Sequence, residues 1–532
     1  MAEEKEEKSL LYKLKPITSR LPAVTRPEGH VHFRTKMMWL ILILILYFAM
    51  TNIMIYGLDT QTGVDLFAQY RAILAGAQFS LMHLGIGPIV TGSIIMQLFT
   101  GAKIIKLNLK DDDDKAVYQS TQKLLVIIMI WVEAVPQVFG FMEPSARFTS
   151  SITSIVGSGA FLSPEGWARL IIVIQLFVGS YLVFLMDEVV SKWGIGSGIS
   201  LFIAAGVAQQ IFTGTLNWHA SDPGAAMSIT NAPAGTIPKT IFLFHNMSAG
   251  ELANGGYERM FLAQPNPLVA LMGTIAIFLF VSYTESSRIE LPLAHGGARG
   301  ARGRYPIKLI YASNIPVILM AALLANVAMF SLLFYSNSAF QNVPLLGGNT
   351  WLGYYPPGMT KPAAGLAFYV SPINGFSDWL LPLLSDSYLN SYNGNLGLYK
   401  SRLQIGAHVL TYVGVMVVGS VLFARFWIET TNMGPEAVAS QIESSGMQIP
   451  GFRRDPRVLK RVLERYIPVV TVISGATVGA LAAGADLIGT VGNASGTGVL
   501  LAVGIMIQLY DAMGREQMME MHPVLRGFFG GE

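Results

Sequence analysis

The chain has 532 residues, of which 52% are hydrophobic and only 13% charged, with a formal net charge of +3 and no cysteine. Soluble domains carry about 25% charged residues, so this composition indicates a polytopic membrane protein. The absence of cysteine excludes disulfides, Cys-ligated zinc and thiol catalysis, and the small net charge gives no support for a general nucleic-acid role.

The first 36 residues form a charged N-terminal segment without an early apolar run, so they are not a secretory signal. Within this segment the stretch "LLYKLKPITSRL" predicts a short amphipathic helix that lies on the membrane surface.

Ten apolar stretches follow, and each predicts one membrane-spanning helix, because a bilayer core of about 30 Å needs roughly 20 mostly apolar residues. The second and fifth are short and rich in glycine. The predicted fold is therefore an all-α polytopic membrane protein. The ten stretches are 37–56, 84–101, 124–142, 168–187, 196–213, 267–284, 309–335, 403–427, 466–485 and 494–513.

Lysine and arginine set the predicted orientation. With ten spans, 28 of the 36 basic residues fall on the side that holds the N-terminus. The positive-inside rule then places both termini, including the tail 514–532, in the cytoplasm. The cytoplasmic loops are 285–308 and 428–465. The long polar segments 214–266 and 336–402 become external loops, and the simplest interpretation gives them no chemistry of their own.

No catalytic constellation is visible in the predicted spans, and no metal site or cofactor is predicted. Glu133 is the acid that lies in the middle of a span, where it serves either helix packing or a moving helix interface. The glycine-rich stretch 294–306 follows no predicted strand, so it does not indicate nucleotide binding. The acidic run "DDDD" before the third span is interpreted as a solvated charge run.

The second stretch contains "HLGIGPIVTGSIIMQLF", which breaks helix geometry at its start. Pro88 is tolerated near a helix beginning, so the helix is expected to start around Gly85–Pro88 and to end near Gly101. At 1.5 Å per residue, Ile86 lies only about 22 Å from that end. The backbone before this helix is then irregular at membrane depth. Such backbone is tolerated inside protein or along a water-filled cavity, which favours a channel or transporter path.

Two glycine-opened helices present similar faces. The first face holds Ile86, Val90, Ser93 and Gln97, and the second holds Ile199, Ile203, Gly206 and Gln210. Aliphatic pairs on both faces predict a shared hydrophobic constriction, and ordinary helix packing is the alternative. Helices one to five and six to ten would form a five-plus-five inverted pseudo-repeat around a central pore, although no convincing symmetry is visible between individual residues.

The segment 57–83 lies between the first helix and Gly85, with a plausible short helix at 64–75. It is too polar to span the membrane, because it carries Asp65, Gln69 and Arg71. It is either an external loop or a re-entrant segment that folds back under the constriction.

The chain resembles the SecY family, the large subunit of the protein-conducting channel, in its archaeal form. The resemblance covers most of the chain and rests on several long motifs in the family's order. These motifs are "LGIGPIVTGSIIMQL", "GIGSGISLFIAAGV", "RYPIKLIYASNIPVIL", "FWIETTNMGPEAVASQIESSGMQIPGFR" and "GNASGTGVLLAVGIM". The two long external loops depart from the shorter archaeal pattern.

The resemblance implies roles for residues at matching motif positions. The segment 57–83 would be the plug. A lateral gate would form from the second, third, seventh and eighth helices, with Thr91, Glu133 and Asn326 as its polar cluster, and here Glu133 departs from the uncharged residue expected. The implied pore ring consists of Ile86, Val90, Ile199, Ile203, Ile318 and Leu501. The residues implied to bind the ribosome are Arg299, Arg302, Arg304, Arg453 and Arg454.

The implied function is a passive channel, not an enzyme, that passes unfolded polypeptides across the cell membrane and releases membrane segments sideways. Its implied partners are SecE-like and Sec-beta-like small subunits, the ribosome, signal sequences, nascent chains and lipid. The chain would divide into an N-terminal half, 37–213, and a C-terminal half, 267–513. The alternative function is a small-molecule secondary transporter with inverted repeats, which would require a buried acid such as Glu133.

Overall fold

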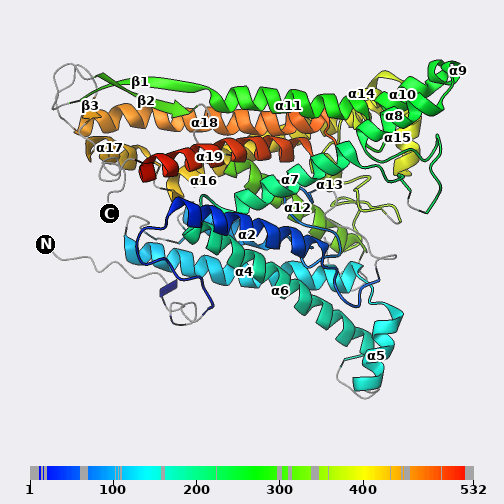
Figure 1. The fold of residues 1–532 in the computed structure, drawn as a ribbon, viewed down its shortest axis with the longest axis horizontal. Coiled ribbons are helices and arrows are strands. Elements are labelled where there is room, and N and C mark those ends of the chain that lie inside the picture. The colour runs from blue at the N-terminus through cyan, green and yellow to red at the C-terminus, as the bar shows by residue number, and fades with distance from the viewer. Residues whose placement is uncertain are drawn as a thin grey trace.

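The architecture comes from a computed structural model of the chain (Figure 1). It describes residues 11–12, 16, 21–59, 70–101, 104–105, 107, 111–156, 162–222, 224–295, 302–308, 314–336, 347–357, 359–431, 433–444, 447–448, 456–492 and 494–521.

All ten predicted helices are present, and they run roughly parallel to one long axis of the molecule (Figure 1). Nine of them are long and apolar enough to cross a membrane. The tenth, α3, has only 15 residues. The helices are α2 (Phe33–Asn52), α3 (Gly87–Gly101), α4 (Asp112–Phe141), α6 (Pro164–Trp193), α7 (Gly198–Leu216), α11 (Leu268–Ser286), α12 (Ile315–Ser336), α16 (Arg402–Thr430), α18 (Pro456–Ile488) and α19 (Gly496–Met521).

The short helix α3 begins where the sequence predicts, because the backbone before it is pinned in a non-helical shape. Gly85 has φ +57°, and a Cβ there would lie 2.1 Å from the Leu74 carbonyl oxygen. The next amide, Ile86 N–H, donates to that same oxygen at 2.8 Å. The irregular backbone is therefore satisfied by neighbouring protein, as membrane depth requires.

The two halves of the bundle share one pattern of neighbours. In the first half α2 packs on α6 and α7, α3 packs on α4, and α6 packs on α4 and α7. In the second half α11 packs on α18 and α19, α12 packs on α16, and α18 packs on α16 and α19. Each contact of helices one to five thus has its counterpart among helices six to ten. Because each half has five helices, the second half starts from the opposite side of the bundle, as an inverted repeat does.

The halves meet along two lines. On one line α3 contacts α12 and α16, and α4 contacts α12; on the other line α7 packs against α19. The two ends of the bundle differ in character. One end carries a small β-sheet and will be called the sheet end, and the other carries short helices of the long connections and will be called the loop end (Figure 1).

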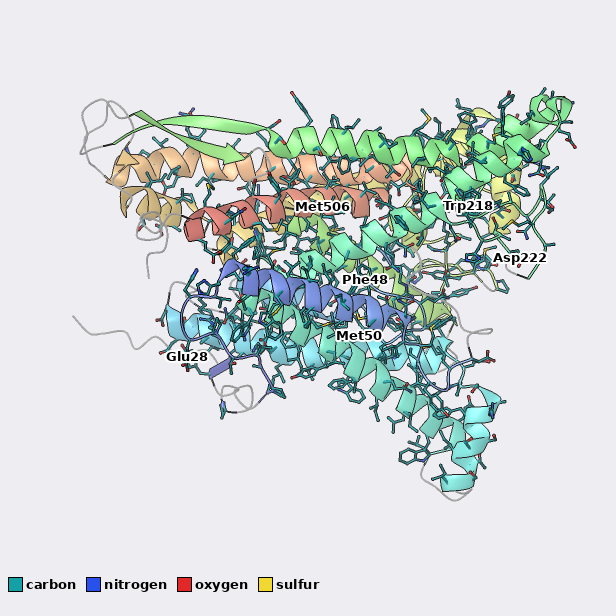
Figure 2. The ribbon with its side chains drawn as sticks, viewed as in Figure 1. Glu28, Phe48, Met50, Trp218, Asp222 and Met506 are labelled. Atoms are coloured by element: carbon teal, nitrogen blue, oxygen red, sulfur yellow. The ribbon has the colours of Figure 1, made fainter. Side chains whose placement is uncertain are left out.

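The loop end is built from short helices. After α4 comes α5 (Ala146–Val156), which projects from the bundle (Figure 1). The two long polar segments fold into compact helical turns, where Trp218 and Asp222 lie beyond the end of α7 (Figure 2). These turns are α8 (Thr236–Asn246), α9 (Ala249–Glu251), η2 (Leu252–Gly256), α10 (Tyr257–Phe261), α13 (Leu366–Val370), η3 (Phe376–Asp378), α14 (Leu380–Leu384) and α15 (Asp386–Leu396).

At the sheet end, three strands form one antiparallel sheet in the order β2-β1-β3. β1 (Arg288–His295) pairs with β2 (Arg302–Lys308) as a hairpin, and β3 (Met447–Gln448), which follows α17 (Pro435–Ser444), pairs with the far end of β1. The expectation that the glycine-rich stretch follows no strand is therefore wrong. It connects two antiparallel strands, which is still not the strand-to-helix context of a phosphate-binding loop.

Small residues set the spacing of the most extensive helix pair, α16 with α18. A Cβ at Gly475 would lie 2.9 Å from Val421 Cα, and a Cβ at Gly479 would lie 2.7 Å from the Met416 carbonyl oxygen. The two glycines are four residues apart on α18, the spacing that lets helix backbones approach closely in membranes.

We expect Gly479→Val to lower the free energy of unfolding by about 1–3 kcal/mol, because the added methyl groups overpack this contact. The measurement is the thermal unfolding midpoint in detergent. Gly484→Val on the same helix is the matched control, since a Cβ there meets nothing within 4 Å. Equal midpoints for the two variants would contradict this account of the α16–α18 contact.

Candidate functional site

The six residues of the implied pore ring lie in one continuous apolar core. We call Ile86, Val90, Ile199, Ile203, Ile318 and Leu501 the apolar collar. All except Ile199 are buried, and Ile199 is half-buried against the same core. Their helices meet across the junction of the halves, α3 against α12 and α7 against α19. The structure therefore places five of these aliphatic side chains on α3, α7, α12 and α19, and Ile86 directly before α3, in the same core. None of these side chains offers a hydrogen-bond donor or acceptor.

The polar part of the α3 face has a different environment. Ser93 Oγ accepts a hydrogen bond from Gln122 Nε2 at 2.7 Å. Gln97 is buried, with its Oε1 lacking a hydrogen-bond partner. At Ser93 the alternative of ordinary helix packing is therefore the observed arrangement, because this hydroxyl joins α3 to α4.

The described part of the segment 57–83, which we call the plug segment, lies against the collar helices. Tyr47 Oη on α2 donates to the Ala75 carbonyl oxygen at 3.1 Å. A Cβ at Gly206 on α7 would lie 3.5 Å from Ala75 Cα, and a Cβ at Gly498 on α19 would lie 3.8 Å from Ala72 Cβ. The segment thus folds back into the bundle, so the interpretation as a free external loop is wrong.

The first half of the short helix expected at 64–75 lies outside the described residues, because 60–69 are not described. Residues 70–75 form consecutive turns in which Leu74 N–H donates to the Tyr70 carbonyl oxygen at 2.9 Å.

A buried histidine joins the plug segment to the helix bundle. His83 Nδ1 accepts from Phe79 N–H at 3.1 Å, so Nε2 carries the proton and donates to Gln137 Oε1 on α4, also at 3.1 Å. Gln137 Nε2 in turn faces Met329 Sδ on α12 at 3.5 Å. Sequence reasoning did not select His83 or Gln137, because they are 54 residues apart and neither belongs to a recognisable motif.

Thr91, Glu133 and Asn326, the implied polar cluster, do come together. The Thr91 hydroxyl donates to Glu133 Oε1 at 2.9 Å and accepts from Asn326 Nδ2 at 2.9 Å. We call these three residues the polar seam, because they link α3, α4 and α12 across the junction of the halves. Glu133 is 1% exposed, and Asn326 Oδ1 has no hydrogen-bond partner. A buried polar atom that lacks a partner is costly, so Asn326 Oδ1 makes this cluster less stable than a fully paired one.

The five arginines implied to bind the ribosome cannot all be placed. Arg302 and Arg304 lie on β2 at the sheet end. Arg299, Arg453 and Arg454 fall outside the described residues, as does most of the predicted N-terminal amphipathic helix.

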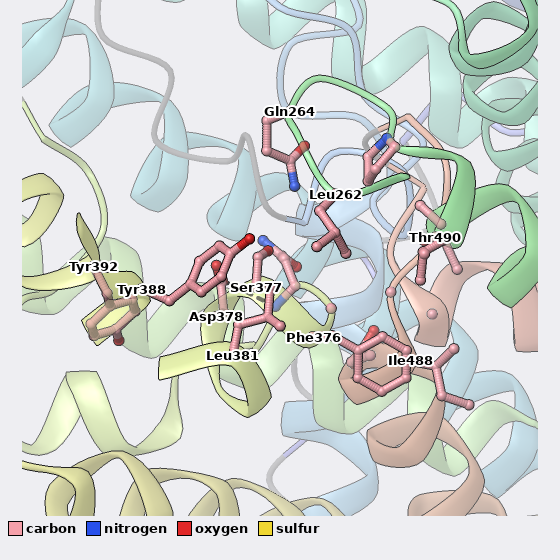
Figure 3. Close-up of a pocket in the computed structure, with 18 of the residues that line it drawn as sticks. Leu262, Gln264, Phe376, Ser377, Asp378, Leu381, Tyr388, Tyr392, Ile488 and Thr490 are labelled. Carbon is pink, nitrogen blue, oxygen red and sulfur yellow. Dashed lines mark hydrogen bonds between the residues drawn. The ribbon is translucent and has the colours of Figure 1, made fainter. Parts of the chain in front are cut away.

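The loop end contains a pocket of about 520 Å³ between the two long connections and the α18–α19 turn (Figure 3). Tyr388, Asp378 and Leu381 face Gln264 and Leu262 across it (Figure 3). These long connections therefore pack on each other instead of lying as separate loops.

Lys239 supports one rim of this pocket. Its Nζ donates to the carbonyl oxygens of Ala263 and Pro265 at 2.6 and 3.0 Å, and burial lowers the pKa of Lys239 to about 8. Among the residues that the structure describes, no group of three or more His, Cys, Asp or Glu side chains could hold a metal ion.

Known proteins resemble this chain in sequence over nearly its whole length. The sequence model of the SecY family matches residues 80–510, and the model of the plug domain of Sec61p matches residues 45–78. The chain is 44% identical to protein translocase subunit SecY of Archaeoglobus fulgidus, over 98% of this chain and 99% of that protein. It is 45% identical to the Haloferax volcanii subunit, over 97% and 98% respectively.

Solved structures agree with these matches. One described as the structure of a protein conducting channel has a TM-score of 0.72 and 36% identity, and covers 96% of this chain and 98% of its own. Sec61 in the canine ribosome-channel complex from the endoplasmic reticulum has a TM-score of 0.69, with the same identity and coverage.

We expect Thr91→Val to lower the free energy of unfolding by about 1–3 kcal/mol, because it leaves buried Glu133 and Asn326 without their shared partner while the side-chain shape is retained. Thermal unfolding in detergent measures the loss. Thr213→Val on α7 is the control, since that exposed hydroxyl bonds only to carbonyls of its own helix. If the control loses as much stability as the seam variant, the hydrogen bonds of the polar seam contribute nothing specific.

Proposed function

Because this chain belongs to the SecY family of protein translocase subunits, we propose that its apolar collar is the seal of a polypeptide-conducting pore. The protein is a multi-pass membrane channel subunit and not an enzyme, and the solved structures that it resembles are protein-conducting channels. The observation that carries the collar proposal is the burial of Val90, Ile203, Ile318 and Leu501, from four different helices, in one core.

An aliphatic collar suits a translocating polypeptide. It offers no ligand to an ion, and a narrow apolar constriction excludes water by dewetting. Its contacts are non-directional, so they tolerate any side chain that passes. In this proposal the plug segment closes the collar at rest through its contacts with α2, α7 and α19, and energy for movement comes from a partner.

The lateral gate is proposed to open along the line where α3 and α4 meet α12 and α16. The polar seam crosses this line through one hydrogen bond, from Asn326 Nδ2 on α12 to Thr91 Oγ1 on α3. Parting the halves there breaks few bonds and gives a signal sequence a path into lipid. The His83–Gln137 hydrogen bond lies between the plug segment and α4, so release of the plug and opening of the gate would be linked.

We assign the sheet end to the cytoplasm, following the excess of lysine and arginine there, with both termini on the same side. The N-terminal half is 37–213 and the C-terminal half 267–513, with the cytoplasmic loops and external loops at the bounds given above. The five arginines of the cytoplasmic loops are proposed to contact ribosomal RNA phosphates. SecE-like and Sec-beta-like subunits are proposed to pack on the lipid-facing helices in the cell membrane.

We expect the double substitution Val90→Asn and Ile203→Asn to raise the resting ion conductance of the channel in planar bilayers several-fold, because amide side chains hydrate the collar. The matched control is Val90→Ile with Ile203→Leu, which keeps the collar aliphatic and should stay as tight as the parent. A polar double variant that does not leak would contradict the collar, and saturable small-molecule flux that Glu133→Gln abolishes would favour a secondary transporter instead.

We expect Arg302→Glu with Arg304→Glu to weaken ribosome binding and to reduce the slope of log affinity against log salt by about two, as loss of two phosphate contacts requires. The measurement is co-sedimentation with ribosomes over a salt series. Charge reversal at Arg169 and Arg402, which lie at the loop end and pair with Glu165 and Asp386, is the control. An unchanged salt slope in the β2 variant would overturn the docking proposal for these two arginines.

A further inference from the structure

Two aspartates hold the beginnings of two collar helices. Asp187 lies near the end of α6, and its Oδ1 accepts a hydrogen bond from Ile199 N–H at the start of α7, at 2.9 Å. Asp486 lies near the end of α18, and its Oδ1 accepts from Thr497 N–H at the start of α19, at 2.8 Å. In both cases the carboxylate of one helix caps the next helix along the chain, where free backbone amides favour an anion.

The two caps occupy the same position in their helices. The first α-helical bond of α7 runs from Leu201 N–H to the Ser197 carbonyl oxygen, and that of α19 from Val499 N–H to the Ser495 carbonyl oxygen, each at 3.1 Å. Counted from these serines, Ile199 and Thr497 are both the second helical residue. The side chain of Ser197 makes no capping hydrogen bond, so Asp187 takes over that task for α7.

A glycine beside each cap allows the start of the helix to lie in close contact with the preceding helix. A Cβ at Gly198 would lie 2.6 Å from Asp187 Cα, and a Cβ at Gly496 would lie 2.0 Å from the Ala485 carbonyl carbon. Backbone meets backbone at both places, so neither helix start can shift along its axis without losing the contact. The caps therefore act on helices whose starting points are already confined.

We propose that Asp187 and Asp486 are paired positioning residues that fix the height of Ile203 and Leu501 in the apolar collar. Each of these collar residues lies four positions, about one turn, after the capped amide, and each is 0% exposed. The inference rests on the proposed function of the collar. It also supplies the symmetry between individual residues that is not visible in the sequence, because α6 ends at the sheet end and α18 at the loop end (Figure 1).

The two caps differ in how firmly they are held. Asp486 Oδ2 also accepts from Tyr412 Oη on α16 at 2.7 Å and from Thr497 Oγ1 at 2.6 Å. The backbone carbonyl of Asp486 accepts from Gly375 N–H of the external connection at 2.9 Å. Loss of the Asp486 carboxylate therefore breaks the bonds to Tyr412 and Thr497 Oγ1 as well as the cap, and so removes more contacts than loss of the Asp187 carboxylate. The backbone bond to Gly375 remains.

The test uses the absence of cysteine from the chain. A single cysteine is introduced as Ile203→Cys or as Leu501→Cys, and membrane vesicles containing the full chain are treated with a membrane-impermeant maleimide from each side. We expect Asp187→Ala to raise labelling at position 203 about fivefold, and Asp486→Ala to raise labelling at position 501 by at least as much, the population shift typical of one lost helix cap. Each alanine variant should leave the labelling rate at the other cysteine position near that of the parent.

Asp187→Asn and Asp486→Asn keep one acceptor oxygen, so each should restore slow labelling. Glu188→Gln is the matched control, because this neighbouring carboxylate bonds to Lys123 and to Val24 N–H instead of to a helix start. Equal increases at both positions in either alanine variant would mean general destabilisation and would overturn the proposal, as would no increase at all. If the polar collar variant does not leak ions, the proposed seal is refuted. The labelling experiment would still decide separately whether the two aspartates position Ile203 and Leu501.

Discussion

The constraint behind this structure is that hydrocarbon offers no hydrogen-bond partner, so the backbone polar groups at membrane depth must be paired inside the protein. The plug segment meets this constraint through Ile86 N–H on the Leu74 carbonyl and Tyr47 Oη on the Ala75 carbonyl. The helix α3 is short because the backbone before it is irregular. By the same constraint, that irregular backbone must lie among other helices. Irregular backbone can therefore lie inside this bundle with its polar groups paired.

At the junction of the halves, single polar side chains form hydrogen bonds to two partners each. Thr91 serves both Glu133 and Asn326, and His83 uses one ring nitrogen for its own segment and the other for Gln137. Shared donors and acceptors keep buried groups paired with few bonds. The polar part of the junction is therefore held by few hydrogen bonds, each with a defined partner.

The sequence allowed prediction of all ten helices, because long apolar runs are set by bilayer thickness alone. It also identified the glycine-opened start of α3. Five of the six residues named as the collar are buried, and their role as a pore seal stays a prediction. Three features were out of its reach for physical reasons. The pairing of β1 with β3 joins strands that are distant in the sequence. His83 and Gln137 meet only in the folded chain, and the long connections pack on each other through contacts without a local pattern.

The sheet joins two connections that both belong to the second half of the bundle. β1 and β2 continue from α11 and lead toward α12, and β3 lies between α17 and α18. Because the sheet is continuous with α11 and is paired with the strand that leads into α18, a force applied to the sheet is passed to helices of the second half.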